Sequence, residues 1–202
     1  MKILDENFFN RKDVNLIAKQ LLGKIISTNI EGEVTSIRVV ETEAYVHMVD
    51  KASHAFNGKR TMKNEHMYGK PGTSYIYLCY GIHNMLNIVT NKENIADAIL
   101  IRAGEPLTGI DLMLKRTGKN KLDFNLTKGP GNLGKALGVS KIHSGKKLNE
   151  NEIYVYEDDF KINENLIGIS NRIGVKYAGE DALLKYRYFI KNNPYVSSKP
   201  NK

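Results

Sequence analysis

The alternation of apolar and polar positions predicts a domain built mainly from β-hairpins. Residues 24–30 contain three isoleucines and a threonine, Glu31-Gly32 has the composition of a tight turn, and residues 33–44 alternate like a strand. A second and more apolar hairpin is expected from Thr73 to Thr90, with its turn at residues 81–84. Further strands are expected at residues 98–102, 153–156, 166–170 and 186–190.

Helical periodicity is confined to three short segments. After Asp13, a good N-cap, apolar residues recur at helical spacing from Leu16 to Leu22, and Gly23 can end the helix. The other two helices are expected at residues 109–116 and 133–137. Because the strands outnumber the helices and no linker divides the chain, we expect one α+β domain over residues 1–202.

Two stretches lack a regular pattern. Residues 46–71 are polar, contain four lysines, and show no sustained periodicity, so we expect a long functional loop there. A basic loop from Gly118 to Lys128 is, like the first, a candidate for contacts with phosphate groups. From Pro194 onward the chain is polar and is expected to form a loose tail.

Composition favours a polyanionic partner and restricts the class of protein. Thirty Lys and Arg residues against 22 Asp and Glu give a formal net charge of +8, which suits nucleic acid, although charge can also serve solubility alone. The single cysteine, Cys79, excludes an internal disulfide and a thiolate zinc cluster. With no signal peptide and no apolar run near the roughly twenty residues of a membrane span, we expect a cytoplasmic protein that is neither secreted nor membrane-embedded.

Two carboxylates are expected on one face of a strand. Strand alternation places Glu41, Glu43 and Tyr45 on the same face. A solvated strand face would explain this pattern without any chemistry. The functional interpretation is a general base, since hydrolysis of a glycosidic bond needs a carboxylate that deprotonates water. The two carboxylates could act as an acid and base pair, or one could serve only as a hydrogen-bond acceptor.

The second hairpin is rich in tyrosine. Tyr75 and Tyr77 share one strand face, whereas Tyr80 lies on the other face, just before Gly81. Tyrosines often pack the core of a sheet, but rings beside basic loops also suit stacking on an extruded base, and a ring at a hairpin tip can wedge into a duplex.

Three other motifs fall short of the sites they suggest. Residues 129–134 read Gly-Pro-Gly-Asn-Leu-Gly, a literal GxGxxG, but the βαβ context of a dinucleotide site is missing, so we expect an ordinary turn and cap or a contact with a DNA phosphate. Residues 69–74 lack the spacing of a P-loop. The residues that raise the question of a metal show no HExxH or comparable spacing, so we expect neither metal nor cofactor; they are His47, His54, His66, His83, Glu41, Glu43 and Asp50.

The chain resembles the alkyladenine DNA glycosylases, also called methylpurine or 3-methyladenine DNA glycosylases, of the non-helix-hairpin-helix type. The segments that carry the resemblance run in order through most of the chain. They are Val40-Glu41-Thr42-Glu43-Ala44-Tyr45, Ser53-His54, Lys70-Pro71-Gly72-Thr73, Tyr75-Ile76-Tyr77, Tyr80-Gly81, Asn87-Ile88, Leu100-Ile101-Arg102-Ala103-Gly104-Glu105-Pro106, Gly129-Pro130, Arg172-Ile173-Gly174-Val175 and Ala178-Gly179-Glu180.

The resemblance implies a catalytic centre around one carboxylate. Glu43 would be the general base, with Arg102 and the main-chain carbonyl of Ile173 helping to hold the attacking water. No lysine or N-terminal amine is implied as a nucleophile. The product would therefore be an abasic site without strand cleavage.

The resemblance also implies how damaged DNA is held. The base-binding pocket would be formed by Tyr45, His54, Tyr77 and Asn87, with Asn87 excluding normal guanine by crowding its exocyclic amine. Tyr80 would fill the vacated space in the minor groove. Ile82 and His83, beside Tyr80, would lie in the intercalating tip and differ from the bulkier residues of some relatives.

The implied fold is a single compact domain with a curved, mainly antiparallel β-sheet, flanking helices and a protruding hairpin. We expect a monomer that acts on double-stranded DNA containing damaged purines, without a membrane partner, and that is nucleoid-associated if the source is bacterial. Two alternatives stay open from the residues alone. One is a non-catalytic module that binds damaged DNA, and the other is a metal-dependent hydrolase built on the glutamate and histidine cluster.

Overall fold

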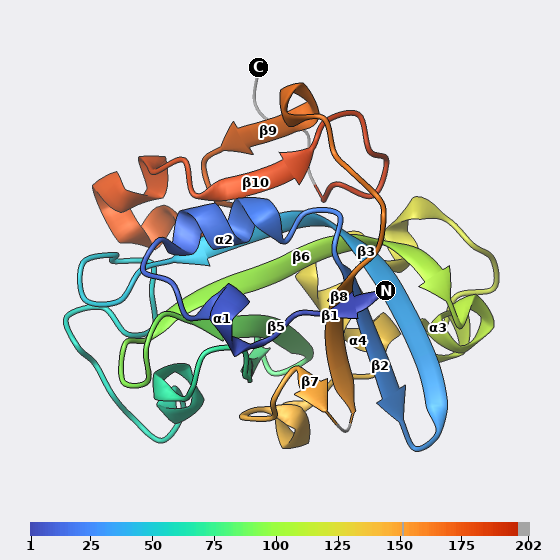
Figure 1. Ribbon diagram of the computed structural model, residues 1–202, viewed down its shortest axis with the longest axis horizontal. Coiled ribbons are helices and arrows are strands. Elements are labelled where there is room, and N and C mark those ends of the chain that lie inside the picture. The colour runs from blue at the N-terminus through green and yellow to red at the C-terminus, as the bar shows by residue number, and fades with distance from the viewer. Residues whose placement is uncertain (151, 198–202) are drawn as a thin grey trace.

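The long strand β3 (Glu33–Tyr45) organises the fold, because three other strands pair with it. The computed structural model describes residues 1–150 and 152–197, and its ten strands form one open sheet in which every strand pairing is antiparallel (Figure 1). Along the sheet the strand order is β1-β8-β2-β3-β6-β5-β4. Strand β7 pairs with β8, and β10 joins both β3 and β9.

The other strands are mostly short, apart from β6. Their bounds are β1 (Lys2–Ile3), β2 (Ile25–Ile30), β4 (Ser74–Cys79), β5 (His83–Thr90), β6 (Asp97–Thr108), β7 (Asn149–Glu150), β8 (Ile153–Glu157), β9 (Ile167–Ser170) and β10 (Arg187–Ile190).

Short helices lie around the sheet. The α-helices are α1 (Glu6–Phe9), α2 (Val14–Gln20), α3 (Ile110–Thr117) and α4 (Pro130–Leu137). The 3-10 helices are η1 (Glu65–Tyr68), η2 (Phe124–Leu126), η3 (Lys141–His143), η4 (Glu164–Leu166) and η5 (Lys176–Leu183). Asp13 caps α2 as expected, since its side chain accepts a hydrogen bond from the Leu16 amide.

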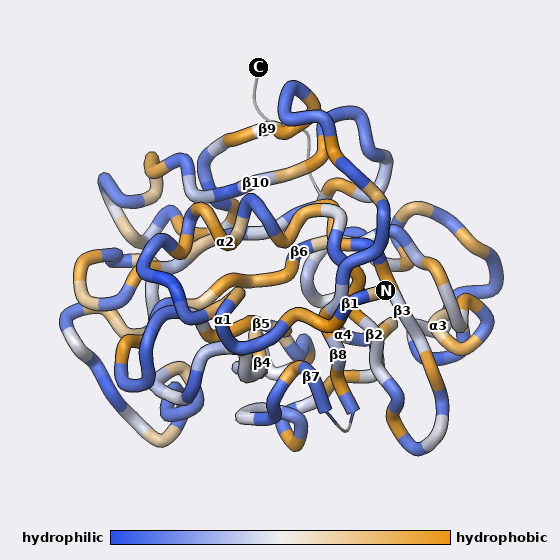
Figure 2. The backbone as a smooth tube through the Cα atoms, viewed as in Figure 1, coloured by the Kyte–Doolittle hydropathy of each residue, from blue (hydrophilic) through white to orange (hydrophobic). Residues whose placement is uncertain are grey.

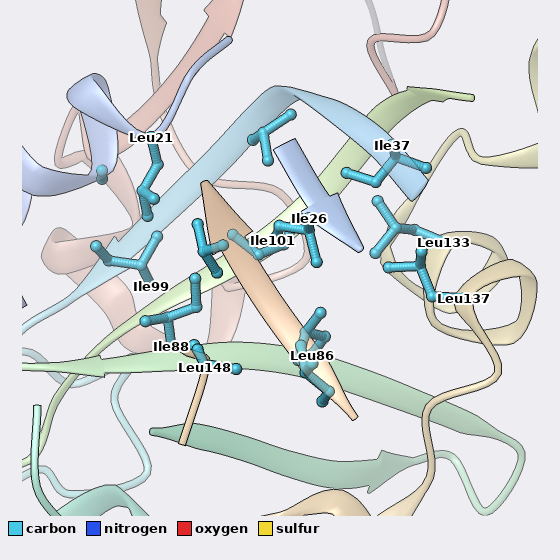
Figure 3. Packing of buried hydrophobic residues seen from close by; sticks show 14 of the residues in the cluster. Leu21, Ile26, Ile37, Leu86, Ile88, Ile99, Ile101, Leu133, Leu137 and Leu148 are labelled. Atoms are coloured by element: carbon cyan, nitrogen blue, oxygen red, sulfur yellow. The ribbon is translucent and has the colours of Figure 1, made fainter. Parts of the chain in front are cut away.

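The main core lies where the sheet meets α2 and α4. Figure 3 shows Leu21, next to the end of α2, together with Leu133 and Leu137 of α4 converging on isoleucines and leucines of β2, β3, β5 and β6. Hydrophobic positions follow the central strand β6, whereas the outer loops are largely hydrophilic (Figure 2). Burial of this apolar surface, at about 25 cal/mol per Å², is the main force that holds the elements together.

A double irregularity in the pairing of β3 with β6 lies beside Glu41. Between Val39 and Thr42 the register shifts twice, so that β3 carries an extra residue at Val40 and β6 carries one at Arg102. A bulge re-aims the side chains next to it. Because the two bulges offset each other, the strands return to register while Arg102 reaches Glu41, to which it is hydrogen-bonded.

The predicted strands and helices are confirmed to within a few residues, and three differences have physical reasons. Strand β6 continues to Thr108 instead of ending at Arg102. The sequence beyond Arg102 contains Gly104 and Pro106, which usually interrupt strands. In the structure, a Cβ on residue 104 would lie 2.6 Å from a methyl group of Ile37, so glycine fits where a larger residue would clash. Pro106 lies beyond the last residue of β6 that pairs with β5, so its missing N–H does not interrupt that pairing.

The second hairpin turns earlier than its sequence predicts. Cys79 pairs directly with His83, so the turn consists of residues 80–82, and His83 already belongs to β5. Tyr80 has a φ of 50° and therefore lies in the turn, not on a strand face. Gly81, which follows Tyr80 in the turn, also has a positive φ, a conformation that glycine adopts readily.

The C-terminal stretch that was expected to be loose is described as far as Ser197. In that part, the Ser197 amide donates a hydrogen bond to Glu41, and the ring of Tyr195 packs edge-on against Phe124. Residues 194–197 are therefore attached to the domain, and the remainder of the predicted tail lies outside the described residues.

Candidate active site

Glu41 and Glu43 lie where β3 is paired on both edges, with β6 on one side and β10 on the other. Both side chains are fully buried, which excludes the interpretation of a solvated strand face. Thr42, between them, points the opposite way and donates a hydrogen bond to the Ala18 carbonyl of α2. The two carboxylates consequently share the face of the strand that is turned away from α2.

Arg102 joins the two carboxylates. Its Nε lies 3.1 Å from Glu41 Oε1, and its Nη1 lies 3.2 Å from Glu43 Oε2. Burial by itself would lower the pKa of Arg102, but the negative charges of Glu43 and Glu41 outweigh burial and hold this pKa above its ordinary value. The guanidinium group is therefore a permanent positive charge between the two glutamates.

Glu41 is engaged as a structural acceptor. Besides Arg102, it accepts hydrogen bonds from Arg187 Nε at 2.6 Å, from the Ser197 hydroxyl at 2.8 Å and from the Ser197 amide at 2.7 Å. A carboxylate offers about four acceptor sites. These four donors occupy the acceptor capacity of Glu41 and leave little room for a water or a substrate.

Glu43 has spare capacity. Its Oε2 accepts hydrogen bonds from Arg102 and from the Tyr45 hydroxyl at 2.8 Å, and its Oε1 accepts one from the Ile173 amide at 2.7 Å. Three donors from the described residues leave about one of the roughly four acceptor sites for a further donor. Of the two glutamates, Glu43 is thus the one that can engage a water molecule.

Tyr45 links this carboxylate to the aromatic residues nearby. Burial, and next the charge of Glu43, raise the pKa of the Tyr45 phenol well above its ordinary value. Tyr45 therefore stays protonated and remains a donor to Glu43. The charge of Tyr77 also contributes to this increase in pKa.

Tyr75, Tyr77 and His54 form a cluster of rings. Tyr75 and Tyr77 are stacked with centroids 5.6 Å apart, which confirms that they share a strand face. His54 meets Tyr77 edge-on at 4.6 Å, and its Nδ1 lies 2.8 Å from the Tyr75 hydroxyl. Burial of the ring, together with the positive charge of Lys59, lowers the pKa of His54, so the neutral imidazole is favoured.

Asn87 is buried on β5 directly opposite Tyr75. Its side-chain Nδ2 donates to the carbonyls of Tyr75 and Met85, both at 3.0 Å. These two bonds fix the orientation of the carboxamide next to the backbone of the tyrosine strand.

The hairpin tip stands apart from the buried groups. Tyr80 is 89% exposed and Ile82 is 73% exposed, whereas His83 is half-buried beside α4. A Cβ on Gly131 would lie 2.7 Å from the His83 ring, so α4 supports the hairpin at close range. The structure thus presents two separate features, a buried carboxylate centre and an exposed aromatic tip.

Several residues that build this centre were not predicted as site residues. Arg187 is an arginine within the otherwise apolar Tyr-Arg-Tyr-Phe-Ile segment, and this contrast was the only sequence signal for it. Arg172 forms a buried ion pair with Asp50 and lies over the ring of Tyr45, 4.7 Å from its centroid. Ser197 had no sequence signal, because its contact with Glu41 spans 156 residues.

The histidine and carboxylate cluster does not assemble as a metal site. Within residues 1–150 and 152–197, no group of three or more His, Cys, Asp or Glu side chains is arranged to hold a metal ion. In the same part of the chain, no helix is both long enough and apolar enough to cross a membrane.

Comparisons with known proteins identify relatives over nearly the whole chain. The family model for methylpurine-DNA glycosylase (MPG) matches residues 7–194. Proteins named "Putative 3-methyladenine DNA glycosylase" from Clostridium perfringens (strain SM101 / Type A) and Desulfitobacterium hafniense (strain Y51) are each 42% identical to this chain. The first alignment covers 97% of this chain and 99% of the relative, and the second covers 98% and 100%.

A protein of the same name from Methanocella arvoryzae is 40% identical, with 98% of each chain covered. The family match extends over the carboxylate centre, the ring cluster and the hairpin tip, and these relatives align over nearly their whole length. The chain belongs to the methylpurine-DNA glycosylase family.

Proposed function

We propose that this protein is a monofunctional DNA glycosylase of base excision repair, which flips alkylated purines out of duplex DNA and hydrolyses their N-glycosidic bond. Deaminated purines are included in the proposed substrate class. Membership of the methylpurine-DNA glycosylase family supports the reaction class, a hydrolysis of N-glycosidic bonds. The observation that carries the mechanism is Glu43, a fully buried carboxylate with one acceptor site unoccupied by described donors.

In the proposed reaction, Glu43 acts as the general base. A water molecule held by Glu43, Arg102 and the main-chain carbonyl of Ile173 attacks the anomeric carbon of the flipped nucleotide. The C–O bond forms as the C–N bond breaks, Glu43 takes the proton from the water, and the purine leaves with the bonding electrons. An alkylated purine already carries a positive charge, and these electrons neutralise it, so no strong general acid is required.

Tyr45, together with His54 and Tyr77 of the ring cluster, is proposed to bind the flipped base. Tyr45 and Tyr77 supply π-faces, and His54 contributes its ring and its backbone to the edge of the base. Stacking on aromatic side chains contributes about 1–3 kcal/mol per base. A cationic purine gains additional attraction to the π-faces. The fixed carboxamide of Asn87 is proposed to exclude normal guanine by crowding its exocyclic amine.

The hairpin tip is proposed to enter the minor groove. Tyr80 fills the space that the flipped nucleotide leaves, and Ile82 and His83 contact the neighbouring base pairs. Flipping costs a few kcal/mol, and the cost is lower for a damaged or weakened pair. This difference contributes to the selection of damaged purines. We propose that the protein works as a monomer on double-stranded DNA in the cytoplasm, and at the nucleoid if its source is bacterial.

The product distinguishes this mechanism from its alternatives. The test is to incubate the protein with methylated duplex DNA, to quantify released purines, and to score strand breaks with and without alkali. The proposal predicts free methylpurines and breaks that appear only after alkali, with no covalent complex trapped by borohydride. Breaks without alkali, or a trapped complex, contradict the monofunctional mechanism, and binding without any release points instead to a non-catalytic damage-binding module.

Two further measurements address the partner and the substrate class. Binding to duplex DNA should weaken steeply as salt rises, because Lys and Arg contacts with phosphates release counterions. A flat response to salt contradicts this mode of DNA binding. Release of hypoxanthine from a duplex with one deoxyinosine decides whether deaminated purines belong to the substrate class.

A further inference from the structure

The chain returns to the catalytic centre after its last strand. Beyond β10 it turns through residues 191–197, with the Asn193 amide bonded to the Ile190 carbonyl and the Val196 amide bonded to the Asn193 carbonyl. Tyr195 packs its ring edge-on against Phe124 of η2, with centroids 5.3 Å apart. Residues 193–197, the C-terminal strap, are thus anchored at both ends, and residues 195–197 lie beyond the part of the chain that the family model matches.

Ser197 is the residue of the strap that reaches the buried charges. Its hydroxyl donates to Glu41 Oε1 at 2.8 Å and accepts a hydrogen bond from Arg102 Nη2 at 3.3 Å. Its amide donates to Glu41 Oε2 at 2.7 Å. One serine therefore contacts both the structural carboxylate and the arginine that bridges to Glu43.

These contacts fix the plane of the Arg102 guanidinium group. Each of its three nitrogens has a different acceptor, with Nε on Glu41, Nη1 on Glu43 and Nη2 on Ser197. A guanidinium is a rigid planar fork, so contacts at three nitrogens determine its orientation. Without the serine hydroxyl, Nη2 loses this partner, and only the contacts of Nε with Glu41 and of Nη1 with Glu43 restrain the orientation of the group.

We propose that the C-terminal strap is part of the catalytic apparatus, and that Ser197 is a positioning residue that holds Arg102 in the orientation needed for hydrolysis. Ser197 does not touch the substrate and acts through Arg102 and Glu41. The proposal rests on the proposed function, because it requires that Arg102 and Glu43 together hold the attacking water.

The test is the excision of methylpurines under single-turnover conditions with the full-length chain. For Ser197→Ala we expect the rate at saturating enzyme to fall by about tenfold to a hundredfold, as for the loss of a hydrogen bond to a charged group. The enzyme concentration for half-saturation should stay within about twofold of wild type, because the hydroxyl does not contact DNA. Ser197→Thr keeps a hydroxyl group and should restore most of the rate.

A matched control separates positioning from stability. Ser27→Ala removes the hydroxyl of a buried serine, which donates to the Thr35 carbonyl on the far part of β3, and it should leave the excision rate unchanged. In an Arg102→Gln background, adding Ser197→Ala should cause no further loss of rate. Fully multiplicative losses overturn the proposal, because Ser197 would then act independently of Arg102.

The same assay with Glu43→Gln separates a failure of the proposed function from a failure of the proposed role of the strap. If Glu43→Gln excises at the wild-type rate, the proposed function of the site fails. If Glu43→Gln is inactive but Ser197→Ala excises at the wild-type rate, only the role of the strap is overturned. A Ser197→Ala variant that is less stable but fully active at saturation likewise overturns the role of the strap.

Discussion

Arg172 and Asp50 form a buried, bidentate ion pair, and Arg172 lies over the ring of Tyr45. Both Nη atoms of Arg172 bind the carboxylate, with Nη2 at 2.8 Å from Oδ1, and the exposed fractions of the two side chains are 0% and 1%. Asp50 also accepts hydrogen bonds from the amides of Val46 and Ala52. The pair consequently ties the loop after β3 to the segment that carries Ile173, and it supports the ring of Tyr45 from one side.

Asp50→Asn should destabilise the fold strongly. The variant leaves the Arg172 charge buried without its counter-ion, and removing one partner of a buried pair costs about 3–5 kcal/mol. Chemical denaturation measures the loss. Glu65→Gln makes the same change in the exposed pair with Arg60 and should have little effect. Similar denaturation midpoints for the two variants would show that the buried pair is not a main support of this region.

Gly134→Ala tests how α4 supports the hairpin whose tip is proposed to enter the minor groove. A Cβ at residue 134 would lie 2.1 Å from the Asn84 carbonyl oxygen, so α4 or β5 must shift. We expect a loss of about 1–3 kcal/mol, the usual cost of overpacking, and weaker DNA binding because the tip moves. Gly131→Ala meets the His83 side chain, which can rotate away, and should cost less. A larger loss of stability in Gly131→Ala than in Gly134→Ala would contradict this account of the packing.

Stability should fall as the pH rises above the ordinary tyrosine pKa. Burial raises the pKa of Tyr75, so the folded protein keeps a proton that the unfolded chain loses above about pH 10. Because the native state then binds more protons than the unfolded state, the free energy of unfolding decreases with pH in this range. In Tyr75→Phe this contribution is absent, so its free energy of unfolding should decline less steeply than that of wild type. If the free energies of unfolding of wild type and Tyr75→Phe change in parallel from about pH 8 upward, the link between Tyr75 protonation and stability is excluded.

Strand alternation and the family resemblance together predicted the central part of the site. The period of two placed Glu41, Glu43 and Tyr45 on one face, and the structure joins these residues through Arg102 and through the Tyr45 hydroxyl. Such a pattern depends only on local geometry, so a sequence can reveal it. The roles of Arg102 and Ile173 came from the resemblance and not from periodicity.

The remaining parts of the site depend on contacts that local patterns do not encode. Arg187 reaches Glu41 across 146 residues, and the paired bulges at Val40 and Arg102 arise from the packing of two strands. Ser197 comes from a polar segment whose composition predicts a loose tail. Strand alternation could not distinguish Glu41 from Glu43 either. The resemblance assigned the general base to Glu43, and the hydrogen-bond partners show that Glu41 is the saturated carboxylate.

The most direct measurement is the release of methylpurines from alkylated duplex DNA by wild type and Glu43→Gln in the presence of a chelator. Wild type should remain active, and Glu43→Gln should bind the DNA while its rate falls by about a hundredfold to ten-thousandfold, the usual contribution of a general base. Glu33→Gln, an exposed glutamate on the same strand, is the matched control and should excise normally. Release by Glu43→Gln at the wild-type rate would contradict the central claim that this carboxylate activates water.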